Sequence, residues 1–214
     1  MIYLLSNGQV GLFAIILFAI IFSLTFHEFG HAAAAKYFGD DTAEQMGRLN
    51  LNPLSHIDPI GLLMVVMVGF GYAKPVPINP RKMRHPWASA VVAFAGPFMN
   101  LVLAVIAINV LVWGHLNSIS FLQGDAQETM LIFLAQINLL LMLFNLIPLG
   151  PLDGHYILPY FLPGNLGYRY HQLNAQYGTF ALMGLIVLSI AGLPVFSTLM
   201  RFSQKLLPVI TFIG

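Results

Sequence analysis

Long apolar stretches separated by polar loops dominate the pattern of this chain. The first runs from Val10 to Phe26, and residues compatible with a helix continue to a stop at Gly39. At about 1.5 Å of rise per residue, a helix over residues 10–38 is roughly 43 Å long, which exceeds the hydrocarbon thickness of a bilayer. Because no Lys or Arg precedes this stretch, we expect a retained spanning helix and not a cleaved signal peptide.

Three further stretches are long enough to cross a membrane. They are Ala88 to Trp113, Glu128 to Ile147, and Gln176 to Leu199, the last interrupted by Gly192 and Pro194. The tail from Arg201 to Gly214 is typical of an interfacial amphipathic segment. The pattern therefore predicts an all-α polytopic membrane protein with about four transmembrane helices.

One apolar segment, Ile60 to Tyr72, is too short for an ordinary span and contains the turn Gly69-Phe70-Gly71. Irregular backbone is tolerated at membrane depth only where protein or a water-filled cavity satisfies its polar groups. We therefore expect a re-entrant segment or one in a protein-lined groove. The residues that follow, Lys74 to Pro86, contain four prolines and four Lys or Arg residues, which predicts a basic connection without a helix.

The composition agrees with a membrane protein. Hydrophobic residues make up 58% of the chain and charged residues only 8%, whereas a soluble domain has about 25% charged residues. The formal net charge of +1 and the lack of long basic runs argue against a nucleic-acid partner. The chain has no Cys, so a metal would have to be held by His, Asp or Glu.

The distribution of basic residues predicts the orientation. Lys and Arg concentrate after the first span, whereas the loop from Gly114 to Gln127 has none. The positive-inside tendency places residues 39–87 in the cytoplasm, together with the loop from Leu152 to Ala175. Arg201 and Lys205 then lie on the outer side, against the tendency. We expect a multi-pass protein of the cell membrane with this orientation.

Three ionisable residues lie inside the first span: His27, Glu28 and His31. Such groups are costly in a membrane and are functional candidates. Four residues apart on one helix face, the two histidines can hold one metal ion. Glu28 points to the side, which suits a base that takes a proton from water at the metal.

A third ligand must come from another segment, and Asp153 is the best candidate by elimination. The other acidic residues lie in the polar loop after the first span or at the opposite membrane face. The third span ends just before Asp153, in the leaflet that contains His27 and His31. Two alternatives stay open: the histidines form a hydrogen-bonded pair between helices, or Asp153-Gly154 is only a turn after Pro151.

Three motifs together resemble the site-2 protease family of intramembrane zinc metalloproteases, in its compact prokaryotic form. They are His27-Glu28-Phe29-Gly30-His31, Gly96-Pro97-Phe98-Met99-Asn100, and the run from Asn145 to Gly154. The resemblance implies one Zn²⁺ per chain, bound by His27, His31 and Asp153, with Glu28 as general base.

The resemblance also implies roles for two asparagines. Asn145 would lie at the catalytic face and hold the substrate backbone or stabilise the oxyanion. The alternative for Asn145 is a helix C-terminal cap before Pro148. Asn100 is expected to be a supporting residue, because Gly96 and Asn100 let the second span pack closely near the metal.

The resemblance implies a function in regulated intramembrane proteolysis. The segment Ile60 to Tyr72 would be a β-hairpin whose edge strand pairs with the substrate, an easily unwound transmembrane segment of another protein. Residues 1–214 would form one membrane-embedded metalloprotease domain, with a catalytic core over about residues 8–160 and the fourth span and tail over 176–214. Substrate choice would come from a regulatory membrane partner, an earlier cleavage or the bilayer itself.

Two rival functions use the same residues. A membrane transporter or metal-binding protein could use His27, His31 and Asp153 as a transit site, but the chain shows no inverted repeat and such a site has no use for Glu28. An inactive relative that binds membrane helices is the other rival, although all the motif residues are present.

Overall fold

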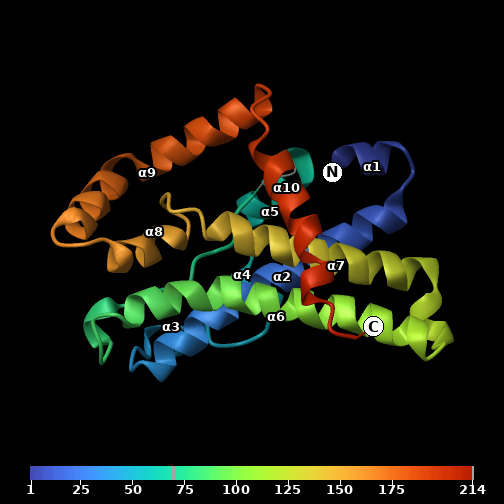
Figure 1. Cartoon of the computed structure of the whole chain (residues 1–214), viewed down its shortest axis with the longest axis horizontal. Coiled ribbons are helices and arrows are strands. Elements are labelled where there is room, and N and C mark those ends of the chain that lie inside the picture. Colours follow the sequence, from blue (N-terminus) through green and yellow to red (C-terminus); the bar gives the residue numbers. More distant parts are fainter. Residues whose placement is uncertain (69–70, 214) are drawn as a thin grey trace.

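The computed structural model describes residues 1–68 and 71–213, and the regular elements of this part are helices (Figure 1). Four of them are long and apolar enough to cross a membrane: α2 (Val10–Tyr37), α6 (Ala88–Leu116), α7 (Asp125–Asn145) and α9 (Leu166–Ile190). This confirms the predicted all-α polytopic fold class.

Shorter elements connect the spans. The short α-helices are α1 (Ile2–Ser6), α3 (Thr42–Gln45), α4 (Pro53–His56), α5 (Pro59–Val68), α8 (Gly154–Ile157) and α10 (Val195–Leu206). The 3₁₀ turns are η1 (Pro80–Lys82), η2 (Ser120–Gln123), η3 (Leu158–Phe161) and η4 (Pro208–Ile210).

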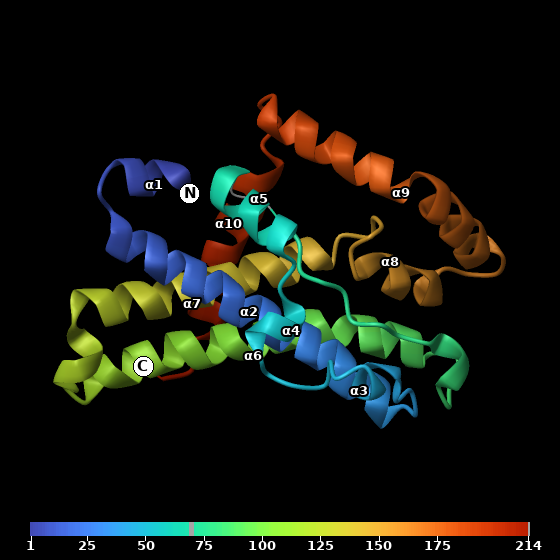
Figure 2. The same ribbon diagram turned by 180° about the vertical axis from the view of Figure 1, so that it is seen from behind.

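Helices α2, α6 and α7 pack side by side and form the centre of the molecule (Figures 1 and 2). Gly30 of α2 lies at the contact between α2 and α6. At Gly30, an added Cβ would lie only 2.7 Å from the carbonyl oxygen of Ala95. Close backbone approach of this kind replaces the hydrophobic driving force that lipid removes, because dispersion contacts then hold the helices together.

The helix boundaries agree with the sequence at the first span and differ at the fourth. Helix α2 ends one residue before its C-cap Phe38, and Gly39 follows with φ of +104°, which favours glycine. The prediction of a fourth span over Gln176 to Leu199 is wrong at both ends. Helix α9 begins earlier, at Leu166, because polar residues can extend a helix beyond its apolar part.

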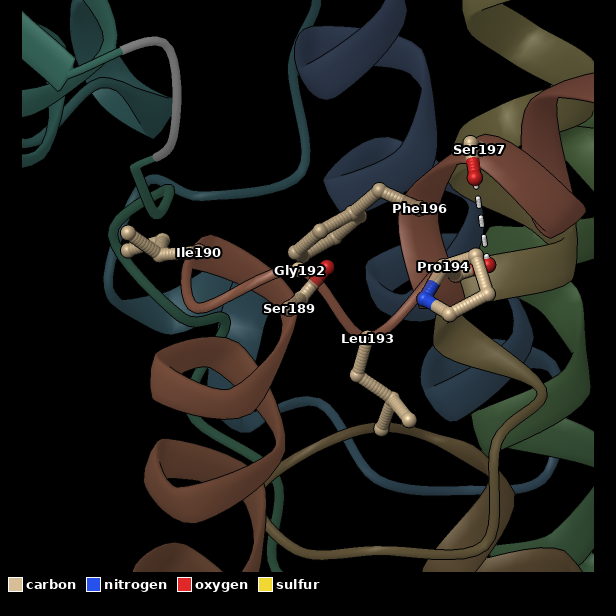
Figure 3. A pocket seen from close by; sticks show the side chains of 7 residues that line it. All are labelled: Ser189, Ile190, Gly192, Leu193, Pro194, Phe196 and Ser197. Carbon is tan, nitrogen blue, oxygen red and sulfur yellow. Dashed lines mark hydrogen bonds between the residues drawn. The ribbon is translucent and has the colours of Figure 1, made fainter.

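A turn at Gly192 and Pro194 interrupts the helical conformation between α9 and α10. Gly192 has φ of +112° there. A pocket of about 330 Å³ lies at this turn (Figure 3). Its lining residues are Ser189, Ile190, Gly192, Leu193, Pro194, Phe196 and Ser197. None of these side chains is ionisable, so the pocket offers no acid–base group.

The segment expected to form a β-hairpin is largely helical. Asp58 accepts hydrogen bonds from the N–H groups of Ile60 and Gly61, both at 2.9 Å, and Pro59 is the first residue of α5. An acidic cap followed by proline starts a helix, so the hairpin prediction is wrong over Pro59–Val68. An antiparallel bridge joins Ile57 to Ala73, on either side of the segment. Gly69 and Phe70 of the predicted turn lie outside the described residues.

Helix α10 crosses α7, and the tail that follows lies against α6 (Figure 1). Asn109 of α6 fixes this tail by its side chain. Its amide nitrogen donates to the carbonyl of Ile210 at 2.8 Å, and its oxygen accepts from the N–H groups of Phe212 at 2.8 Å and Ile213 at 3.2 Å. One asparagine therefore satisfies three polar groups of non-helical backbone beside a membrane-length helix.

We predict that Asn109→Leu loosens the tail, because three backbone groups lose their partner. The expected loss of stability is about 1–3 kcal/mol, measured by thermal unfolding in detergent, with faster hydrogen exchange over residues 207–213. Asn117→Leu is the control, since Asn117 is exposed at the end of the same helix and its side chain donates to the carbonyl of Trp113 in that helix. Equal stability of the two variants would contradict the prediction.

Candidate metal centre

The side chains of His27, Glu28 and His31 are buried in the second half of α2. The helix carries them toward α6 and the turn after α7. Its other buried polar residues, Ser23 and Thr25, bond carbonyls one turn earlier, at 2.6 and 2.8 Å. The polar face of α2 is thus satisfied within the protein, as an apolar environment requires.

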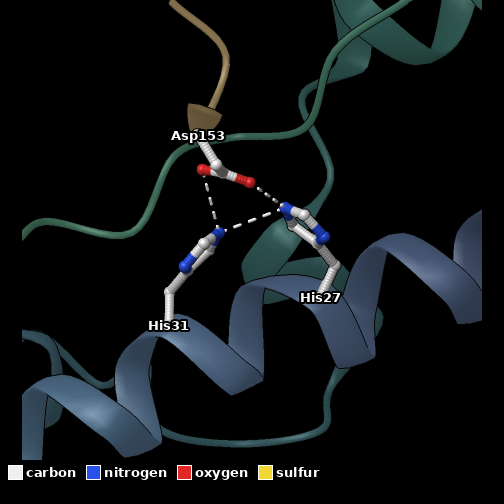
Figure 4. A group of neighbouring side chains, drawn as sticks. All are labelled: His27, His31 and Asp153. Atoms are coloured by element: carbon white, nitrogen blue, oxygen red, sulfur yellow. Dashed lines mark hydrogen bonds and ion pairs between the residues drawn. The ribbon is translucent and has the colours of Figure 1, made fainter. Parts of the chain in front are cut away.

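The structure brings His27, His31 and Asp153 together (Figure 4). The Nε2 atoms of the two histidines are 3.1 Å apart, and Asp153 places Oδ2 3.2 Å from His27 Nε2 and Oδ1 3.4 Å from His31 Nε2. Tetrahedral ligands at about 2.0–2.1 Å from a zinc ion are separated by about 3.3–3.4 Å. The three side chains therefore have the spacing of a zinc site.

The hydrogen bonds behind the imidazoles fix which nitrogen faces the centre. Nδ1 of His27 lies 2.6 Å from the side-chain oxygen of Asn100, and Nδ1 of His31 lies 2.7 Å from the carbonyl oxygen of Val92. Because both partners accept, each Nδ1 carries the hydrogen and each Nε2 presents a lone pair. Two lone pairs and a carboxylate facing one point repel each other, and a cation removes that repulsion.

Asp153 itself gives a second test of the fit. Its Oδ2 atom is buried, and within the described residues no hydrogen-bond donor reaches it. A buried carboxylate oxygen with no donor, aimed at two imidazoles, fits a metal ligand.

Behind His27, a buried network crosses the three central helices. Asn100 of α6 donates to Asn138 of α7 at 2.8 Å, and Asn138 donates to the hydroxyl of Ser23 in α2 at 2.8 Å. All three side chains are fully buried. The sequence indicated only a supporting role for Asn100 through packing, and it missed Asn138, whose one signal was an asparagine inside an apolar span.

Gly96 allows α6 to approach the site. A Cβ added at Gly96 would collide with the imidazole of His31 and lie 2.8 Å from Cε1 of His27. The expected packing role of Gly96 is thus a direct contact with both rings.

The turn that carries Asp153 is supported by the first half of α9. The N–H of Gly150 donates to Asn174 at 2.9 Å, and the hydroxyl of Tyr170 donates to the carbonyl of Pro148 at 2.7 Å. The fourth span therefore positions the segment that carries Asp153.

Two other predicted residues lie near these elements. Glu28 accepts a hydrogen bond from the N–H of Val76 through Oε2, at 3.0 Å. Asn145 is the last residue of α7, half-buried, and its amide donates to the carbonyl of Leu141 at 3.0 Å. Asn145 is not one of the three clustered ligands, and its role stays a prediction.

A bundle of membrane-length helices that brings two buried histidines and an aspartate together, with a buried glutamate next to one histidine in sequence, defines a membrane-embedded protein with a candidate metal site. Residues 15–129 match peptidase family M50, a range that includes His27, Glu28 and His31 and ends before Asp153. The chain belongs to this family, which confirms the resemblance to site-2 proteases.

The relatives agree with the family. The chain is 38% identical over 181 residues to the provisionally named zinc metalloprotease YwhC of Bacillus subtilis, covering 83% of this chain and 82% of that protein. It is 34% identical to the provisionally named zinc metalloprotease Rip2 of Mycolicibacterium smegmatis, covering 69% of this chain and 57% of that protein. Rip2 of Mycobacterium tuberculosis (strain H37Rv) is 30% identical, over 86% of this chain and 70% of that protein. No solved structure gives a significant match.

We predict that Gly96→Ala abolishes metal binding, because the new methyl group occupies the space of both imidazoles. Zinc content of the purified protein is the measurement. Gly184→Ala is the matched control, since a Cβ there has nothing within 4 Å. Stoichiometric zinc in Gly96→Ala would show that the site tolerates the methyl group and contradict the geometry.

We further predict that Asn100→Leu weakens zinc binding about 10- to 100-fold, because His27 loses the acceptor that orients it. Competition with a chelator measures the affinity, and Asn117→Leu again serves as the exposed control. An unchanged zinc affinity would mean that the network does not position His27.

Proposed function

We propose that this chain is an intramembrane zinc endopeptidase, which hydrolyses peptide bonds within or next to transmembrane segments of other proteins. The observation that carries the proposal is the cluster of His27 and His31, buried in a helix apolar enough to span a membrane, with Asp153 from the turn after α7. The buried Glu28 is next to His27 in sequence. The family membership and the names of the relatives support a metalloprotease, and they do not favour the transport alternative.

The chemistry divides among named residues. Zinc held by His27, His31 and Asp153 would polarise the scissile carbonyl and make water a stronger nucleophile. Glu28, next to His27 in sequence, takes the proton from the attacking water and delivers it to the leaving amine. Asn145 is proposed to hold the substrate backbone from the end of α7.

The position of the site limits the substrate class. The two histidines lie on a membrane-length helix, so we infer that a substrate reaches them from the bilayer or its cytoplasmic surface. A helical substrate hides its carbonyls in intrahelical bonds, so the cut segment must be extended first. Transmembrane segments with helix-breaking residues are therefore the proposed substrates, and cleavage of such segments is the chemistry of regulated intramembrane proteolysis.

The proposed orientation places the site toward the cytoplasm of a multi-pass cell-membrane protein. His27 and His31 lie in the half of α2 that leads to the basic connection over residues 39–87. The positive-inside tendency assigns that connection to the cytoplasm.

The experiment compares wild type with Glu28→Gln and Asp153→Ala, purified in detergent and incubated with single-span substrates containing helix-breaking residues. We expect one zinc per chain and cleavage in wild type, zinc with cleavage lowered about 10²- to 10⁴-fold in Glu28→Gln, and neither in Asp153→Ala. Glu44→Gln is the matched control, because Glu44 is exposed and pairs with Lys36. Full cleavage by Glu28→Gln would refute the mechanism.

A further inference from the structure

Arg48 is a buried arginine in the loop between α3 and α4, with only 7% of its surface exposed. Its guanidinium donates to two successive backbone carbonyls, those of Lys74 at 2.6 Å and Pro75 at 3.2 Å. The planar fork of arginine suits such paired acceptors, and lysine cannot reproduce the geometry. The chain has few charged residues, and Arg48 is one that is buried and bound to the backbone of residues 74 and 75.

The piece that Arg48 holds belongs to an extended segment over residues 73–79. The N–H of Lys74 donates to the carbonyl of His56 at 2.8 Å, and the N–H of Asn79 donates to the buried carboxylate of Asp40 at 2.6 Å. The side chain of Val76 packs with Ala32 and neighbours in a small apolar cluster. The segment is therefore fixed at both ends and in the middle.

The residue after the two held carbonyls is Val76, whose N–H donates to Oε2 of Glu28. A carboxylate can rotate, and a donor fixed on one oxygen sets where the other points. Arg48 is also close enough to act on this carboxylate by charge. Burial lowers the pKa of the Arg48 guanidinium, and the charge of Glu28 opposes that change.

We propose that Arg48 is a positioning residue of the reaction: it holds residues 74–76 so that the N–H of Val76 fixes the carboxylate of Glu28 beside the metal ligands. This inference rests on the proposed peptidase function for its kinetic consequence. Its structural half, the link from Arg48 to Val76, is measurable without catalysis.

A cover over the site is the competing explanation for the same contacts. A cover blocks substrate, so loosening it would raise turnover or lower KM. A positioning segment has the opposite effect, because a catalytic group displaced by a fraction of an ångström loses rate. The sign of the change in kcat separates the two explanations.

The test uses Arg48→Gln, with Arg81→Gln as matched control, because Arg81 lies exposed in the same basic connection and its loss removes the same charge. Zinc content, kcat and KM on a single-span substrate, and amide hydrogen exchange over residues 73–79 are measured. Two prolines, at 75 and 77, leave few amides in this stretch, so the exchange of Val76 is readily isolated.

For Arg48→Gln we expect full zinc content, kcat lowered about 10- to 100-fold with KM within about twofold, and faster exchange at Val76. Arg81→Gln should match wild type in every readout, and Arg48→Lys should recover only part of the lost kcat. Val76→Pro is the second variant, because it removes the N–H donor and keeps Arg48. It should lower kcat about 10- to 100-fold, and this result is available even if Arg48→Gln does not fold.

Three outcomes would overturn the proposal: unchanged exchange at Val76 in Arg48→Gln, unchanged or increased kcat despite faster exchange, or normal kcat in Val76→Pro. If wild type cleaves no substrate, the proposed function fails on its own. The exchange of Val76 then decides whether Arg48 holds this segment on Glu28.

Discussion

The absence of water around most of this chain is the constraint on which the structure depends. Polar groups in such surroundings need partners from the protein itself, because lipid supplies none. The two buried histidines, the asparagine pair behind His27 and the tail on Asn109 all follow this rule. The metal centre differs in one respect. There, the Nε2 atoms of His27 and His31 and the carboxylate of Asp153 are acceptors that face one another. These atoms need a cation and not a hydrogen-bond donor.

That arrangement couples the metal to the fold. His27 is tied to α6 and α7 through Asn100, whereas Asp153 sits on a turn held by α9. A cation that binds both residues joins the central three-helix bundle to the fourth span. Because a ligand that binds only the folded state stabilises that state, metal binding contributes to the docking of α9 as well as to chemistry.

The sequence predicted the parts that depend on local pattern. Hydropathy and Gly39 gave the limits of α2, and counting spans from the basic loops placed Asp153 in the same leaflet as His27. The sequence pattern did not predict hydrogen-bond partners that come from distant segments of the chain. Asn138 and Arg48 act through residues 38 and 26 positions away, and nothing local to either residue specifies that contact. The prediction of a β-hairpin over Ile60 to Tyr72 is wrong for a local reason, because Asp58 caps the start of a helix there.

The supports of the three functional groups differ in how firmly they are held. His27 depends on helices that pack over their whole length, whereas Asp153 depends on α9, which lies apart from the central bundle and contacts mainly η3 and α10 (Figures 1 and 2). Glu28 depends on the segment over residues 73–79, through the N–H of Val76. Local opening is therefore easier at the turn that carries Asp153 than at the helices that hold the two histidines, since local openings occur where buried contacts are fewest.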